Sequence, residues 1–88
     1  MKEQSDFLVR AKGTYSFHRS KLILTDSNWT LAYTAKALKR SLGSICEDLL
    51  IARWAKTHEK QLEKFSYAYE ALEWIRKKQK EIDLSEID

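Results

Sequence analysis

The fold of this chain is decided by residues 29–52, which read WTLAYTAKALKRSLGSICEDLLIA. Two runs with the spacing of helical faces stand on either side of a short break in this stretch. The first run places a small residue, Ala35, three positions before an apolar anchor, Leu38. A helix-turn-helix needs these sizes at these positions, so we expect that motif at about residues 30–53. The inward stripe of its second helix would be Ile45, Leu49 and Ala52.

Capping signals set the boundaries of the first motif helix. Thr30 is the expected N-cap, because a threonine hydroxyl can accept a hydrogen bond from the first free backbone amides. The helix should then run from Leu31 to about Lys39. Trp29 precedes the cap and is expected to pack back on the helix as a hydrophobic staple. We therefore expect Trp29 to be a packing residue.

Two start signals compete for the second motif helix, after a break at residues 40–43. Ser41 can cap the helix directly, or Ser44 can form a capping box with Glu47 three positions later. In both cases the helix is expected to end near Lys56. Its outward face would carry Leu42, Gly43, Ser44, Cys46, Glu47 and Leu50.

The flanking segments predict further helices. The first segment runs from Lys2 to about Ser20 and is expected to be helical after an N-cap at Ser5, while Gly13 leaves an extended piece at residues 14–17 as an alternative. Residues 25–28 are the clearest loop, because their polar side chains compete for backbone hydrogen bonds. A last helix is expected at about residues 66–82, followed by a frayed tail at residues 83–88. Together these elements predict a single all-α domain, a small bundle of four or five helices.

Composition agrees with helices and excludes several classes of protein. The chain has 88 residues, no proline and two glycines, which suits helix interiors. A single cysteine, Cys46, excludes an intramolecular disulfide and a cysteine-based zinc site, and no other metal or cofactor is expected. No glycine-rich phosphate loop or catalytic constellation is present, so we do not expect an enzyme. The charged N-terminus and the short apolar runs predict neither a secretory signal nor a membrane segment, and hence a cytoplasmic protein.

Charge divides the chain into two halves. Residues 1–44 hold eight Lys or Arg and three Asp or Glu, a balance of +5, and residues 45–88 hold eight and ten, a balance of −2, which together give +3. A basic first half suits an anionic partner such as duplex DNA, because clustered cations attract phosphates. A basic patch also occurs as an ordinary solvated face, so the charge alone assigns no partner.

The motif resembles that of a known family. The run Trp-Thr-Leu-x-x-Thr-Ala-x-x-Leu, followed by Ser-x-x-Ser-Ile-x-Glu-Asp-Leu-x-x-Ala, resembles the helix-turn-helix of ParB/KorB-type DNA-binding proteins and of related small regulators from phages and plasmids. It covers about 24 of the 88 residues. The resemblance implies a regulator whose second motif helix enters the major groove, in the host cytoplasm if a phage encodes it. The matching residues are Thr34, Ala35, Leu38, Ser41, Ile45, Glu47, Asp48, Leu49 and Ala52.

The turn departs from the family pattern. Where such motifs usually have glycine and then an apolar residue, this chain has Lys39 and Arg40. Loss of the glycine destabilises the fold if that residue takes a left-handed conformation. The alternative is a longer turn, in which Leu42 and Gly43 take these roles one register later. Lys39 and Arg40 would also add two cations where the motif passes the phosphates.

The expected DNA contacts fall into two groups. Lys36, Lys39 and Arg40 are expected to bind phosphates, which supplies affinity without sequence information. Glu47 can accept a hydrogen bond from cytosine, and Asp48 is expected to cap a helix or to pair with a lysine. The full expected contact set is Lys36, Lys39, Arg40, Ser41, Leu42, Gly43, Ser44, Cys46, Glu47 and Arg53.

The expected assembly is a homodimer, because one such module covers little DNA. The aromatic face of the last helix is the candidate dimer contact. Three alternatives stay open at the level of sequence: an ordinary helical hairpin core, a DNA-packaging small subunit, and an adaptor that binds another protein, for example an inhibitor of a host enzyme. Salt-dependent binding to duplex DNA separates the regulator from the adaptor.

Overall fold

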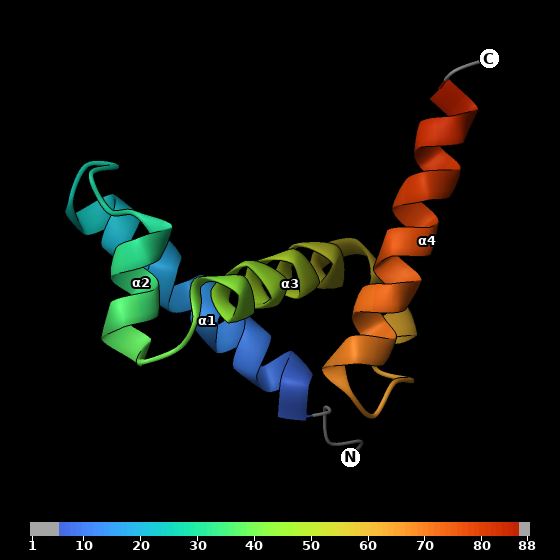
Figure 1. Ribbon diagram of the computed structural model, residues 1–88, viewed down its shortest axis with the longest axis horizontal. Coiled ribbons are helices and arrows are strands. Elements are labelled where there is room, and N and C mark those ends of the chain that lie inside the picture. Colours follow the sequence, from blue (N-terminus) through green and yellow to red (C-terminus); the bar gives the residue numbers. More distant parts are fainter. Residues whose placement is uncertain (1–5, 87–88) are drawn as a thin grey trace.

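The computed structural model describes the backbone of residues 6–86 and the side chains of residues 6–82. This part of the chain folds into four helices, with no strand among the described residues. The prediction of an all-α protein is therefore confirmed. The helices are α1 (Asp6–Leu24), α2 (Leu31–Leu38), α3 (Leu42–Leu62) and α4 (Ala68–Glu86), drawn in Figure 1.

Helix α1 is continuous through the position where the sequence allowed a break. Gly13 lies inside the helix, and the alternative of an extended piece at residues 14–17 is wrong. Thr14, the next residue, is buried, and its hydroxyl donates to Asp48 of α3 at 2.8 Å. The helix continues to Leu24, four residues past its predicted end at Ser20. The start of the segment at Lys2 and the predicted cap at Ser5 lie outside the described residues.

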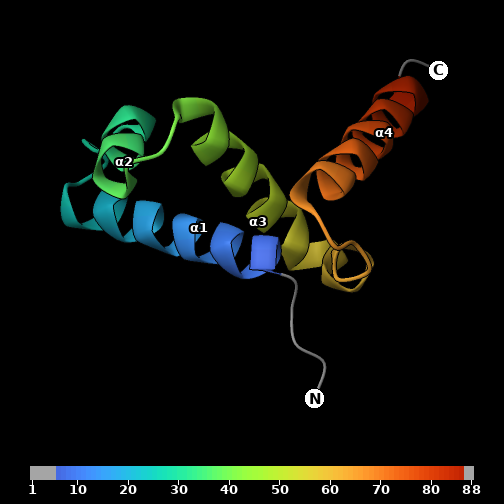
Figure 2. The same ribbon diagram turned by 60° about the horizontal axis from the view of Figure 1, so that its bottom comes forward.

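The core forms where α3 crosses α1, as Figure 2 shows. Leu8 and Ala11 of α1 and Ile51 of α3 are completely shielded from solvent in this crossing. Burial of a leucine or isoleucine side chain of this kind stabilises the folded state by about 1.5–3 kcal/mol. Of the packing positions expected in the motif, Ala35 and Ile45 are buried, while Leu38 and Leu49 are half-buried. Two of the three positions of the expected inward stripe are therefore confirmed as buried, Ile45 and Ala52, whereas Leu49 is only partly covered.

Helix α3 bends at His58 and continues beyond its predicted end at Lys56. The backbone of His58 leaves the helical region (φ −129°, ψ 32°), and the last turn brings the buried Leu62 against α4. An aromatic cluster fills the angle between the two helices, with the rings of Trp54 and Trp74 edge to face at 6.0 Å. The imidazole of His58 contacts both tryptophans. The bend therefore directs the chain into α4.

Only the first half of α4 packs against the rest of the protein. Ala71, Leu72 and Ile75 are buried, whereas Tyr67 precedes the helix and is 61 % exposed. The second half extends away from α1 and α2 in both views (Figures 1 and 2). The helix continues to Glu86, past the predicted end at Ile82, so residues 83–86 are helical where fraying was expected. Residues 87–88 of that tail lie outside the described part.

The described part of the chain lacks two kinds of site. None of its helices combines the length and apolarity that crossing a bilayer requires. Within the same residues, no three His, Cys, Asp or Glu side chains gather as ligands for a metal ion.

Candidate nucleic-acid interface

The turn between α2 and α3 contains a lysine in the left-handed conformation. Lys39 has φ 56° and ψ 45°, and its backbone N–H donates to the carbonyl of Lys36 at 3.3 Å. The next N–H, of Arg40, donates to the carbonyl of Ala35 at 2.9 Å, which completes a Schellman motif. The longer turn expected from the missing glycine is wrong. Gly43 lies inside α3 instead, and no described glycine has a positive φ.

Both motif helices begin at predicted caps. The hydroxyl of Thr30 accepts from the N–H of Tyr33 at 3.2 Å, and the hydroxyl of Ser41 accepts from the N–H of Ser44 at 3.2 Å. The direct cap at Ser41 therefore prevails over the capping box of Ser44 and Glu47. Helix α3 consequently starts at Leu42, three residues after the left-handed lysine.

Trp29 packs on the start of α2, as its place before the cap predicted. Its ring lies 5.3 Å from that of Tyr33, and its indole N–H donates to the Thr34 hydroxyl at 2.7 Å. The same hydroxyl lies 2.6 Å from Nδ1 of His18 on α1. Thr34 is completely buried, so these two bonds satisfy a polar atom that water cannot reach. These two hydrogen bonds of Thr34 fix the position of α2 relative to α1.

Arg40 turns into the molecule, where it holds the turn against α1 and α3. Its guanidinium forms an ion pair with Asp48, bonds the hydroxyl of Ser44 and donates to Thr14 at 3.2 Å. Asp48 is 1 % exposed and also accepts from Thr14 at 2.8 Å and from Arg10 at 3.3 Å. The expected phosphate contact of Arg40 is therefore corrected, because its charge is committed to Asp48. Asp48 pairs with arginines rather than with the expected lysine.

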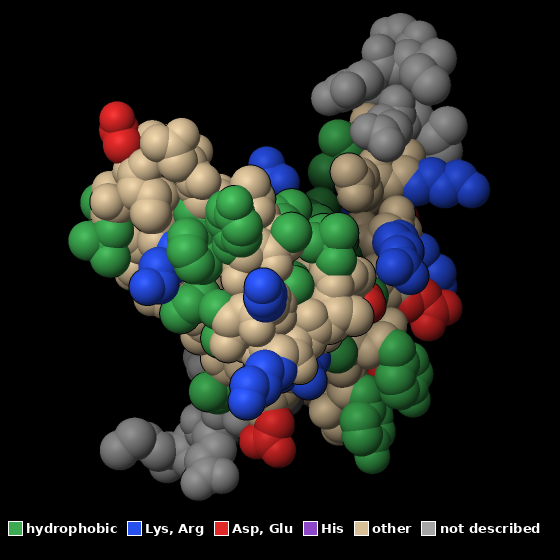
Figure 3. Space-filling view, turned by 60° about the vertical axis from the view of Figure 1, so that its left-hand side comes forward, with side chains coloured by type: hydrophobic (Ala, Val, Ile, Leu, Met, Phe, Trp, Pro, Cys, Tyr) green, Lys and Arg blue, Asp and Glu red, His purple; other side chains and the backbone are tan. Residues whose placement is uncertain are grey.

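The remaining members of the expected contact set lie on the surface of α2 and α3. Figure 3 views the α1–α2 side of the molecule, where lysine and arginine side chains stand among hydrophobic ones. Ser44 is half-buried against Arg40. Arg53 lies eleven residues after Leu42, about 16 Å along the helix axis, which separates it from the start of α3. The exposed members are Lys36, Lys39, Ser41, Leu42, Gly43, Cys46, Glu47 and Arg53.

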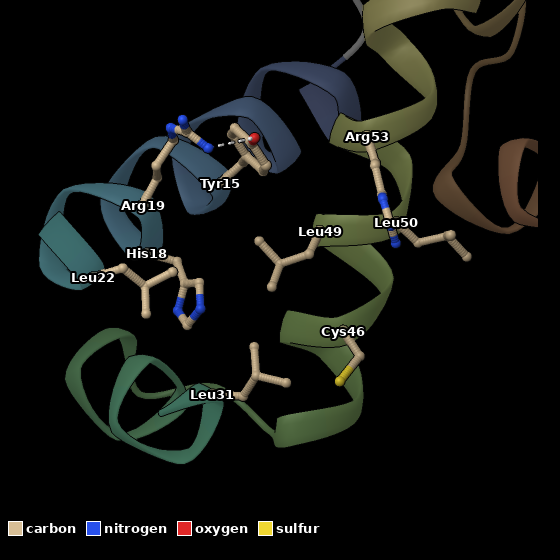
Figure 4. Close-up of a pocket in the computed structure, with 9 residues that line it drawn as sticks. All are labelled: Tyr15, His18, Arg19, Leu22, Leu31, Cys46, Leu49, Leu50 and Arg53. Atoms are coloured by element: carbon tan, nitrogen blue, oxygen red, sulfur yellow. Dashed lines mark hydrogen bonds between the residues drawn. The ribbon is translucent and has the colours of Figure 1, made fainter. Parts of the chain in front are cut away.

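Next to this surface lies an apolar groove that the sequence did not suggest. It encloses about 460 Å³ between α1, α2 and α3, and Figure 4 shows the side chains around it. Its lining includes Cys46 and Arg53 from the expected contact set, and Leu50 from the expected outward face of the second motif helix. A groove formed by three helices depends on how they cross, which apolar spacing along one helix does not reveal. The lining residues are Tyr15, His18, Arg19, Leu22, Leu31, Cys46, Leu49, Leu50 and Arg53.

A second cation cluster lies between α1 and α3. Lys56 donates to the phenol oxygen of Tyr15 at 2.6 Å, and Arg19 lies 3.5 Å from the same oxygen. The hydrogen bond from Lys56 is the main cause of a lowered pKa of Tyr15, with the charges of Lys56 and Arg19 acting in the same direction. Two cations from different helices therefore meet at the Tyr15 hydroxyl.

Comparison with family models, with curated proteins and with solved structures finds no match to this chain. The resemblance to ParB/KorB-type proteins stays a hypothesis that rests on the residues of the motif.

Proposed function

We propose that this protein is a regulatory protein of the phage or plasmid type that binds duplex DNA through α2 and the first turns of α3. One observation carries the proposal: α2 and α3 are capped helices joined by three residues, and exposed lysines flank the start of α3. A helix N-terminus favours anions, because its first amides are unpaired and its dipole is positive there. Lys36 and Lys39 add charge at this end.

The start of α3 has the size and the side chains for the major groove. Leu42 is 50 % exposed, and Gly43 beside it has open space where a side chain would be. The backbone of α3 can therefore approach a base pair closely at this position. Leu42 can contact a thymine methyl group, and Glu47 one turn later can accept a hydrogen bond from cytosine. Burial of Asp48 removes one carboxylate that would repel phosphates.

Fluorescence anisotropy with random and genomic duplexes across a salt series tests the proposal. We expect Lys36→Gln and Lys39→Gln each to weaken binding to all sequences and to lower the salt slope by about 1, because each removes one phosphate contact. Lys60→Gln is the matched control, since Lys60 is an exposed lysine near the far end of α3. If the parent protein binds no duplex at low salt, the proposal is wrong.

A variant of the base-reading surface separates specific from general binding. Glu47→Gln should change the order of preference among duplexes, because an amide can donate where the carboxylate only accepts. Equal weakening on every duplex would remove Glu47 from the base-reading residues.

A further inference from the structure

The groove between α1, α2 and α3 has an apolar lining that α4 leaves uncovered. Leu22, Leu49 and Leu50 are half-buried in it, and Leu31 at its margin is 36 % exposed. Apolar surface that gathers in a concave site of this kind usually marks an interaction site, because water contact with it is unfavourable. An occupant must therefore supply apolar side chains.

The groove also has a basic rim. Arg19 of α1 and Arg53 of α3 are exposed and belong to its lining (Figure 4). Two guanidinium groups on opposite walls favour carboxylates, with which arginine forms paired hydrogen bonds. The occupant should therefore combine acidic and apolar side chains within one short segment.

The chain itself contains such a segment. Residues 83–88 read DLSEID, with three acidic residues, two apolar ones and no lysine or arginine. The acids are Asp83, Glu86 and Asp88, and the apolar residues are Leu84 and Ile87. Ile82, which precedes the segment on α4, is 50 % exposed. Both the charge and the apolarity of residues 83–88 are thus complementary to the groove.

The direction of α4 determines whether residues 83–88 can reach the groove of their own chain or only that of a second copy. The helix continues to Glu86 and extends away from α1 and α2 in both ribbon views (Figures 1 and 2), so it carries the segment away from the groove of its own chain. We infer that residues 83–88 of a second copy bind in the groove. Reciprocal docking of two segments in two grooves gives a closed two-fold dimer, the commonest symmetry of homo-oligomers. This inference does not depend on DNA binding.

Charge exchange in the full chain tests the contact by sedimentation velocity over a concentration series. Arg19→Glu with Arg53→Glu should weaken self-association by on the order of tenfold, because attraction becomes repulsion at two pairs in each of the two grooves. Asp83→Lys with Glu86→Lys should do the same. The four changes together should restore association, since the signs match again. A dimer that survives either pair, or a fourfold variant that stays monomeric, overturns the inference.

The control variant carries the same charge change elsewhere. Lys60→Glu with Lys64→Glu alters two exposed lysines near the end of α3 and should leave association unchanged. Far-ultraviolet circular dichroism checks that each variant keeps its helical content. Equal weakening in this control would assign the effect to net charge rather than to the groove, which also overturns the inference.

Alkylation of Cys46 reports whether the groove is occupied in the parent protein, without any substitution. It is the only cysteine of the chain, it is exposed, and it lines the groove. Its alkylation by iodoacetamide should slow as protein concentration rises, because the docked segment covers the thiol. In the Arg19→Glu, Arg53→Glu variant the rate should not depend on concentration. If the alkylation rate of the parent protein is also independent of concentration, the groove is empty or holds a different molecule, and the inference is wrong.

Discussion

Replacing Lys39 by glycine should stabilise the protein. A residue with a side chain in the left-handed region has a cost of roughly 1–2 kcal/mol, which glycine avoids. Lys39 occupies that region, with φ 56° and ψ 45°. Glycine gains more conformational freedom in the unfolded chain, which offsets about 0.5–1 kcal/mol of the benefit. The expected net gain for Lys39→Gly is therefore about 0.5–1 kcal/mol, or roughly 2–8 °C in Tm for a chain of this size.

Urea unfolding monitored by circular dichroism measures this gain as a higher midpoint with an unchanged slope. The same variant loses one proposed phosphate contact, so its DNA affinity should fall while its stability rises. Lys39→Gln is the matched control, because it removes the charge but keeps a side chain in the left-handed conformation. It should lower DNA affinity without raising the midpoint. A midpoint for Lys39→Gly at or below that of the parent would refute the conformational argument.

Three further substitutions test the interior and the basic edge. Asp48→Ala removes the ion-pair partner of Arg40 and should lower the free energy of unfolding, measured in urea, by about 3–5 kcal/mol. The double variant Asp48→Leu with Arg40→Met removes both charges and should lower it by less. Equal losses in the two variants would contradict the pairing. Ile45→Ala removes a fully buried side chain and should lower the free energy of unfolding by about 2–5 kcal/mol. Lys56→Met should raise the pKa of Tyr15 toward 10.0 in a spectrophotometric titration, which Tyr15→Phe identifies. Because the folded protein lowers the pKa of Tyr15, ionised Tyr15 stabilises the fold at alkaline pH, and this stabilisation is lost as the pH falls through that pKa. Lys56→Met should therefore reduce stability at alkaline pH relative to the parent protein.

Local signals predicted the parts of this fold that depend on a few neighbouring residues. The cap at Thr30 was predicted, and the cap at Ser41 was one of two candidates for the second motif helix; the hydroxyls of both residues accept from the amide three residues later. The loop after α1 follows from its polar side chains, and Asp26 and Ser27 indeed take left-handed conformations there. Helix ends were less predictable, because tertiary contacts such as the burial of Leu62 extend a helix beyond its local signals.

The partners of charged side chains could not be predicted from spacing. Asp48 was expected to cap a helix or to pair with a lysine, although no lysine lies at the helical spacing of three or four residues from it. Its partner Arg40 lies eight residues away across the turn, and Arg10 lies on another helix. Only the crossing of α1 and α3 brings these groups together. The apolar groove escaped prediction for the same reason, since three helices form its walls.

Arg40 and Asp48 together explain how the turn tolerates its unusual sequence. The ParB/KorB-type motif, to which this stretch has an untested resemblance, usually has an apolar residue at the position of Arg40, and an apolar anchor would hold the turn on the core. Here the guanidinium reaches Asp48 and Thr14 instead, so a buried ion pair fixes the turn against α1 and α3. The same pair takes one cation and one carboxylate away from the proposed DNA surface. In the proposed complex, Lys36, Lys39 and Glu47 would set the charge near the phosphates, and these three residues should account for the salt dependence of binding.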